Sequence, residues 1–157
     1  MHVKEVGARF DHITLDSQIW MRCAPRSSMP GHLLLCAVRL LEANGDVALG
    51  TQAVTAWSLR RAFFRDGQDI ARHEVLLDLA KQQQLPVDKV RQYLADGSAH
   101  AALCEDLELA KAQGIQASPT LVFNEGRQRL SGNVGYRIME ANIRELLEAA
   151  PGQLSWC

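Results

Sequence analysis

Cysteine is the residue type in this 157-residue sequence best suited to covalent chemistry, and it occurs at Cys23, Cys36, Cys104 and Cys157. Thiol–disulfide exchange needs an attacking thiolate and a second cysteine nearby that resolves the mixed disulfide. A pair separated by two residues at a helix N-terminus meets both needs, because the helix dipole lowers the pKa of the attacking thiol. No two of the four cysteines have this spacing. We therefore assign no catalytic residue.

The surroundings of the cysteines predict mainly structural roles. Cys36 lies on the apolar stripe of a helical segment, so we expect a small residue of the hydrophobic core. Cys104 is predicted in the middle of a helix, at the edge of its polar face, and Cys23 precedes a proline-containing loop that could expose it. Cys157 ends the chain, where a thiol is open to oxidation but is not organised for catalysis.

Two histidine–cysteine pairs have a spacing that metal sites use. His32 precedes Cys36 by four residues and His100 precedes Cys104 by four, so each pair shares one face of a predicted helix. Each pair is half of a zinc site, which needs four ligands. The two helices would have to face each other, and Cys36 fits the core better than a metal site. We therefore expect no metal.

The composition and the net charge of the chain argue against two classes of partner, nucleic acids and membranes. Apolar residues make up 47% of the chain, and 17 basic against 18 acidic residues give a net charge of −1. This balance argues against nucleic acid as the main partner, because phosphate binding needs clustered cations. The longest purely apolar run, residues 33–38, is far below the ~20 residues that a membrane span needs. The polar N-terminus does not resemble a signal peptide, so we expect a cytoplasmic protein.

The spacing of apolar residues predicts a mostly helical chain. After a short opening helix and strand, apolar residues recur every three or four positions for about eighty residues from Pro30. We predict five helices there, the second beginning near Val47 and the fourth at Pro86. Glycines mark most of the predicted helix ends: Gly45, Gly67, Gly97 and Gly114.

The pattern changes after Gly114. Residues 119–123 form a short run of strand-favouring residues, 124–127 have the composition of a turn, and 128–131 return as a second strand. A final amphipathic helix follows and is stopped by Pro151.

Several segments together resemble one family. Residues 114–123, GIQASPTLVF, resemble the cis-proline strand of thioredoxin-fold proteins, and the order of elements resembles the DsbA family of thiol–disulfide oxidoreductases. The likeness is strongest to the branch related to 2-hydroxychromene-2-carboxylate isomerases. Further matches are RAFFRDGQDI (61–70), EVL (74–76) and GNVGYR (132–137), so the resemblance runs from about residue 10 to residue 150.

The resemblance implies a mostly helical α/β protein with a partial thioredoxin-like fold. Proteins of this family begin with a strand, a helix carrying CxxC and another strand, and the 157 residues contain no such segment. The expected parts are a remnant of the N-terminal thioredoxin portion (1–24), a helical insertion (25–113), a C-terminal hairpin and helix (114–150) and a tail (151–157). Two explanations for this difference from the family remain open: the chain is a shortened product, or it is a natural family member without the redox half.

The same resemblance implies a substrate-binding segment at Ala117, Ser118 and Pro119. Most X–Pro bonds in folded proteins are trans, whereas the family likeness implies a cis bond that presents the backbone of residue 117 or 118 to a peptide or to glutathione. In the isomerase relatives a serine replaces the first active-site cysteine. Ser27 and Ser28 lie outside that position, and we expect one of them to cap the helix near Pro30.

Three functions remain open at this point. The first is a DsbA-like thiol–disulfide oxidoreductase that lacks its redox motif in this chain. The second is a non-catalytic thioredoxin-like module for binding or assembly, and the third is a glutathione-dependent isomerase or transferase. Whether the chain is an enzyme stays undecided, and glutathione is the one conceivable cofactor. Because an incomplete thioredoxin fold leaves a strand edge and an apolar face uncovered, we expect a homodimer or larger oligomer with the hairpin region between subunits.

Overall fold

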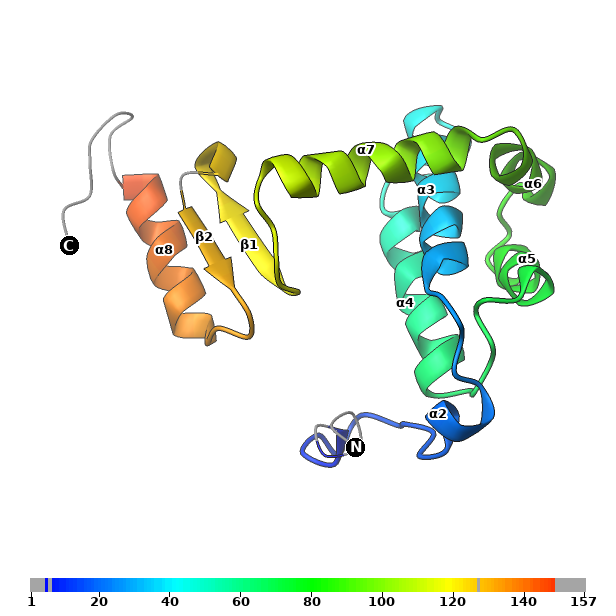
Figure 1. Cartoon of the computed structure of the whole chain (residues 1–157), viewed down its shortest axis with the longest axis horizontal. Helices are drawn as coiled ribbons and strands as arrows, with labels where there is room; N and C mark the ends of the chain where they lie inside the picture. Colours follow the sequence, from blue (N-terminus) through cyan, green and yellow to red (C-terminus); the bar gives the residue numbers. More distant parts are fainter. Residues whose placement is uncertain (1–4, 6, 127, 149–157) are drawn as a thin grey trace. The chain divides into compact units, whose positions relative to one another are not determined.

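The computed structural model describes residue 5, residues 7–126 and residues 128–148 (Figure 1). The chain divides into two units, Met1–Asp106 and Leu107–Cys157. Within the described residues, no helix combines the length and the apolar character needed to cross a membrane. The four-part division expected from the family resemblance stays a prediction.

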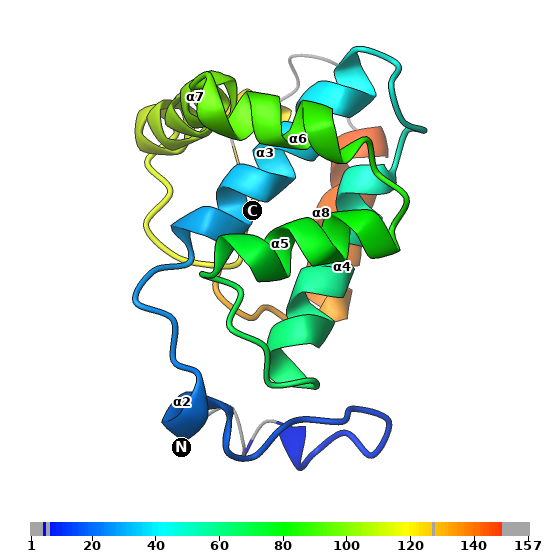
Figure 2. The same cartoon turned by 90° about the vertical axis from the view of Figure 1, so that its right-hand side faces the viewer.

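The first unit is built from helices, which follow each other closely along the chain. They are α2 (Ile19–Arg22), α3 (Met29–Ala43), α4 (Thr51–Phe64), α5 (His73–Gln82), α6 (Val87–Ala95) and the first part of α7 (Ser98–Ala112). Helix α3 is central, because it contacts α4, α5 and α6 (Figure 2). The predicted series of five helices, α3 to α7, is confirmed.

The core of this unit explains why α3 occupies its centre. Buried residues recur along α3 at spacings of three and four, which places them on one face: Leu34, Ala37, Val38 and Leu41 are all fully buried. Each buried leucine stabilises the fold by roughly 1.5–3 kcal/mol relative to an exposed one. Residues of α4, α5, α6 and α7 complete the same cluster.

The helix ends follow the predicted signals, with one shift. Ser28 is the N-cap residue of α3 but makes no side-chain capping hydrogen bond. The hydroxyl oxygen of Ser27 instead accepts a hydrogen bond from the backbone N–H of Met29 at 3.0 Å. Gly67 turns the chain after α4 with a φ of 65°, as its type predicted. Helix α4 begins at Thr51 rather than near Val47, because Gly50 has a left-handed φ of 92° that a helix cannot continue through.

The N-terminal segment differs from the prediction made for it. We predicted a short helix and a strand before the first long helix, and only the helix, α2, is present among the described residues. Residues 8–17 form turns and irregular backbone. A strand needs a neighbouring strand for its backbone hydrogen bonds, and the described part of this unit offers none.

The second unit carries the end of α7, a hairpin and a helix. Strand β1 (Thr120–Phe123) pairs antiparallel with β2 (Gln128–Ser131) across the 3-10 turn η1 (Asn124–Gly126), and α8 (Tyr136–Glu148) follows (Figure 1). The predicted C-terminal hairpin and helix are therefore confirmed. The expected stop of the last helix at Pro151 lies outside the described residues.

Candidate functional site

The segment between α7 and β1 is held at both ends by backbone hydrogen bonds. At the end of α7, the N–H of Ile115 donates to the carbonyl of Ala110 at 2.9 Å, and the N–H of Gly114 donates to that of Lys111 at 3.0 Å. This pattern with Gly114 at a φ of 62° is the Schellman motif, which ends a helix and redirects the chain. Residues 115–119 therefore leave α7 in a defined direction.

The three residues that the resemblance nominated lie together on the surface. Ala117, Ser118 and Pro119 are all exposed, and the Ser118–Pro119 peptide bond is cis, the isomer that the family likeness implied. The hydroxyl of Thr120 donates to the carbonyl of Ala117 at 2.6 Å. The N–H of Gly132 donates to the carbonyl of Pro119 at 2.8 Å, which ties the segment to the end of the hairpin.

The register of the hairpin decides which backbone groups of β1 point away from β2. In an antiparallel pair, residues that exchange hydrogen bonds alternate with residues whose N–H and C=O face the opposite edge. The bond from Gly132 to Pro119 begins the bonded series, which Leu121 continues. Thr120 and Val122 therefore present their N–H and C=O groups at the other edge of β1. Within the described residues the sheet has two strands, so no strand covers this free edge of β1.

The cysteines are not arranged for exchange chemistry. Cys36 is buried in the helical core, as predicted, and burial raises the pKa of its thiol, with Asp106 adding to that rise and Arg39 opposing it. A raised pKa leaves little of the nucleophilic thiolate at neutral pH. Cys23 is half-buried and Cys104 is exposed on α7; Cys157 lies outside the described residues.

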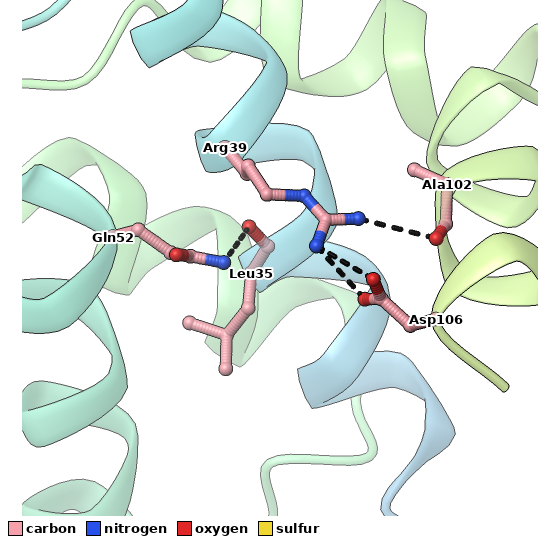
Figure 3. Close-up of polar contacts among 5 residues, drawn as sticks. All are labelled: Leu35, Arg39, Gln52, Ala102 and Asp106. Carbon is pink, nitrogen blue, oxygen red and sulfur yellow. Dashed lines mark hydrogen bonds and ion pairs between the residues drawn. The ribbon is translucent and has the colours of Figure 1, made fainter. Parts of the chain in front are cut away.

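Arg39, whose charge lowers the pKa of Cys36, is itself hydrogen-bonded to Asp106. The guanidinium of Arg39 donates to both carboxylate oxygens of Asp106, at 2.8 and 2.9 Å, and to the carbonyl of Ala102 at 3.1 Å (Figure 3). On the other side of α3, the side-chain amide of Gln52 donates to the carbonyl of Leu35 at 3.3 Å. Arg39 lowers the pKa of the Cys36 thiol and Asp106 raises it, but burial is the largest cause and raises the pKa. This cluster therefore does not activate the buried thiol.

The two histidine–cysteine pairs are not brought together into a metal site. Cys36 lies in the core, whereas His32, His100 and Cys104 are exposed. Among the described residues no three histidine, cysteine, aspartate or glutamate side chains are grouped as metal ligands.

Comparison with known proteins identifies the family and the fold of this chain. A family model described as thioredoxin matches residues 53–147, more than half of the chain. The chain belongs to the thioredoxin family. A crystal structure of a Nitrosomonas europaea protein, provisionally titled a protein disulfide isomerase, superposes with a TM-score of 0.67 at 22% identity. That match covers 94% of this chain and 69% of the other, and it establishes a common fold. The predicted resemblance to thioredoxin-fold proteins of the DsbA type is thus confirmed.

The curated relatives are named as adapter proteins, not as disulfide isomerases. The ClpXP adapter protein SpxH of Bacillus licheniformis is 33% identical over 125 residues, which cover 76% of this chain and 41% of the relative. SpxH of Bacillus subtilis is 25% identical over 145 residues, 88% of this chain and 47% of that protein. The chain therefore spans less than half the length of these thioredoxin-family relatives.

Sequence reasoning missed two residues that shape the site. Thr120 was interpreted only as a strand former, yet its hydroxyl holds the carbonyl of Ala117. Gly132 enters the sequence analysis only as part of the GNVGYR match, yet its N–H donates to the carbonyl of Pro119. A hydroxyl residue directly after the Ser118–Pro119 pair was the one signal available, because such side chains often bond to nearby backbone.

Proposed function

We propose that residues 1–157 form a protein-binding module of the thioredoxin family that holds an extended segment of a client protein at the free edge of β1. The observation that carries the proposal is this edge, where Thr120 and Val122 turn their backbone groups away from β2. Strand addition at such an edge supplies main-chain hydrogen bonds to an extended peptide. The exposed residues Ala117, Ser118 and Pro119 extend the same binding surface.

An adapter role fits this chain better than covalent chemistry. The SpxH relatives are named as ClpXP adapters, and an adapter needs to bind a client rather than to react with it. The sequence contains no CxxC, and Cys36 is buried with a raised pKa. These observations support binding without thiol–disulfide exchange by these residues.

Strand addition can be tested by removing one backbone donor at a time. The probe is fluorescein-labelled ribonuclease A, reduced and carbamidomethylated so that it stays unfolded, and binding is measured by fluorescence anisotropy. Val122→Pro removes the N–H that faces the free edge, and we expect at least about fivefold weaker binding. Arg129→Pro is the matched control, because it removes the N–H of the residue opposite Val122 on β2, which faces the other side.

Several outcomes are informative in this experiment. Equal effects of the two proline variants, or no saturable binding by the wild type, would overturn the proposal, provided that circular dichroism shows both variants folded. In a second measurement the chain is added to purified ClpXP with the same labelled client. An adapter should raise the degradation rate, and an unchanged rate would leave a binding module without adapter activity toward ClpXP.

Thiol–disulfide exchange is the second candidate, and the fold shared with the Nitrosomonas protein is the observation that favours it. It requires a cysteine pair that residues 1–157 do not contain. With dithiothreitol and insulin as substrates, this chain should not accelerate disulfide reduction beyond dithiothreitol alone. Clear turnover would favour the redox function. Glutathione binding at residues 117–119 stays a prediction that calorimetric titration can check.

A further inference from the structure

A groove of about 530 Å³ lies in the first unit, along one side of α4, and none of its lining residues belongs to β1. The segment 12–15 forms one wall and the second half of α4 forms the other. Its lining includes His12, Ile13, Trp57, Arg60, Arg61 and Arg65.

The groove is a consequence of helix geometry. Trp57, Arg60, Arg61 and Phe64 are spaced at three, four and seven positions, so they share one face of α4. The opposite face is buried in the core through residues such as Leu59. The backbone N–H of Asp16 donates to the carbonyl of Phe64 at 2.7 Å, which fixes the segment 12–15 next to the helix.

The charge of the groove is concentrated and positive. The groove is lined by three arginines, Arg60, Arg61 and Arg65, although the net charge of the whole chain is −1. Arg65 is neutralised by its neighbour Asp66, with hydrogen bonds of 2.6 and 2.9 Å. Arg60 and Arg61 form no ion pair with a carboxylate in the described part of the chain, although Arg61 contributes to lowering the pKa of Asp66.

The groove also offers an exposed aromatic surface beside these cations. The side chain of Trp57 is 61% exposed, and Ile13 is 43% exposed on the facing wall. Tryptophan and arginine are the residue types that most often dominate the energy of protein interfaces. A guanidinium binds a carboxylate through two parallel hydrogen bonds, which an ammonium group cannot do.

We propose that this groove binds an acidic segment of a partner protein, in which an aliphatic or aromatic side chain stands between carboxylates. The carboxylates would pair with Arg60 and Arg61, and the apolar side chain would contact Trp57. This inference rests on the proposed function only in that the occupant is part of another protein. It names a second binding surface, with a chemistry different from strand addition at β1.

A nucleic acid is the other class of anion that arginines and aromatic rings recognise. Binding of a phosphate backbone depends on a cationic surface that neutralises many phosphates, whereas two arginines without an ion pair fit a short acidic peptide. The even balance of basic and acidic residues in the chain also favours the peptide.

The test uses a fluorescein-labelled peptide with the sequence Glu-Asp-Phe-Leu-Asp-Glu and the full chain, again with anisotropy as the readout. A control peptide replaces every carboxylate by its amide, and we expect at least about tenfold weaker binding of that control. Arg60→Glu and Arg61→Glu should each weaken binding of the acidic peptide about tenfold, and Trp57→Ala about fivefold. Lys81→Glu is the matched control, since it makes the same charge change on an exposed lysine of α5 and should change binding less than about twofold.

Three results would overturn the inference. They are equal binding of the acidic and the amide peptide, equal effects of Arg60→Glu and Lys81→Glu, and tighter binding of a short oligothymidine that Arg60→Glu abolishes. Ribonuclease A is a basic protein, so it is a poor ligand for an arginine groove. Client binding that survives Arg60→Glu, together with failure of the acidic peptide, would reject this inference and leave the proposed function intact.

Discussion

Arg39 and Asp106 connect α3 to α7 through one guanidinium nitrogen, because Nη1 donates to both carboxylate oxygens at 2.8 and 2.9 Å. The second nitrogen, Nη2, donates to the carbonyl of Ala102 at 3.1 Å, one turn earlier on α7. The hydrogen bonds that Arg39 donates to Asp106 raise the pKa of Arg39 above its ordinary value. The pair spans 67 positions of the sequence and attaches the first part of α7 to the helical core.

Removing Asp106 should therefore loosen α7. We expect Asp106→Ala to lower the free energy of unfolding by about 1 kcal/mol, a modest value because both side chains are more than one-third exposed. Urea denaturation followed by circular dichroism measures the change. The control is Asp78→Ala, which breaks the more exposed pair with Lys81 and should cost under about 0.5 kcal/mol. Equal losses for the two variants would contradict the role assigned to Arg39 and Asp106.

The fully buried side chain of Leu41 gives the second prediction. Leu41→Ala leaves a cavity in the centre of the helical core, and we expect a loss of about 2–5 kcal/mol in the free energy of unfolding. Leu49→Ala makes the same chemical change at a side chain that is 93% exposed, so its effect should stay within about 0.5 kcal/mol. Denaturant unfolding of both variants checks this, and similar midpoints would show that Leu41 is not in the core.

Gly67 tests the connection between the end of α4 and the opening segment. A Cβ at position 67 would lie 2.6 Å from a carboxylate oxygen of Asp16, and the φ of 65° already disfavours other residues. Gly45 has a φ of 72° but open space around it. Gly45→Ala should cost about 1–2 kcal/mol for its backbone conformation, and Gly67→Ala at least about 1 kcal/mol more because Asp16 must move. Thermal unfolding of the two variants measures the difference, and equal melting temperatures would be contrary to this expectation.

Asp96 should make the free energy of unfolding depend on pH in the acid range. Its carboxylate accepts a hydrogen bond from the backbone N–H of Ser98 at 2.9 Å, and hydrogen bonds from the Ser98 side chain and backbone lower the pKa of Asp96. A lowered pKa means that the ionised carboxylate stabilises the folded state above its ordinary pKa. The contribution is lost as the pH falls below about 4 and through the lowered value.

The corresponding variant is Asp96→Asn, which keeps an acceptor oxygen but has no charge. The wild type should be the more stable protein at pH 7, and the difference should shrink below about pH 4. Urea midpoints measured from pH 7 to pH 2.5 provide the check. A difference that stays constant over this range would rule out the carboxylate of Asp96 as its source.

Self-association is the fifth prediction. Helix α8 exposes large apolar side chains, among them Tyr136, Ile138, Ile143 and Leu147, and Leu121 of β1 is also partly exposed. Apolar surface of this kind favours association. We expect a homodimer or larger species in sedimentation velocity at tens of micromolar, and Ile143→Glu should shift it toward monomer. A wild-type monomer at that concentration would refute the prediction.

Much of the fold could be predicted from the sequence because its signals are local. The ends of α3 and α4 follow from Asn44-Gly45 and from Gly67, residues that stop a helix wherever it packs. The amphipathic spacing along α3 also predicts its buried face. The start of α4 could not be placed correctly, since the sequence does not reveal that Gly50, in addition to Gly45, adopts a left-handed conformation.

The two candidate sites also differ in how much of each the sequence predicts. Residues 117–119 were nominated through a motif, and the structure adds the hydrogen bonds from Thr120 and Gly132 that hold them. The groove beside α4 was not foreseen, because it forms only where the segment 12–15 meets the helix. No periodicity in the sequence relates these two groups of residues, which are 42 or more positions apart.

The sequence by itself determined the chemistry that these residues can perform, because the spacing of cysteines is a property of the chain and no CxxC occurs in it. It also determined most of the helices, since helix formation depends on neighbours within a few residues. Only the tertiary structure decided that Arg39 pairs with Asp106 beside the buried Cys36, that one edge of β1 is free among the described residues, and that His12 and three arginines line one groove. These relationships depend on packing between distant segments, which local propensity does not specify.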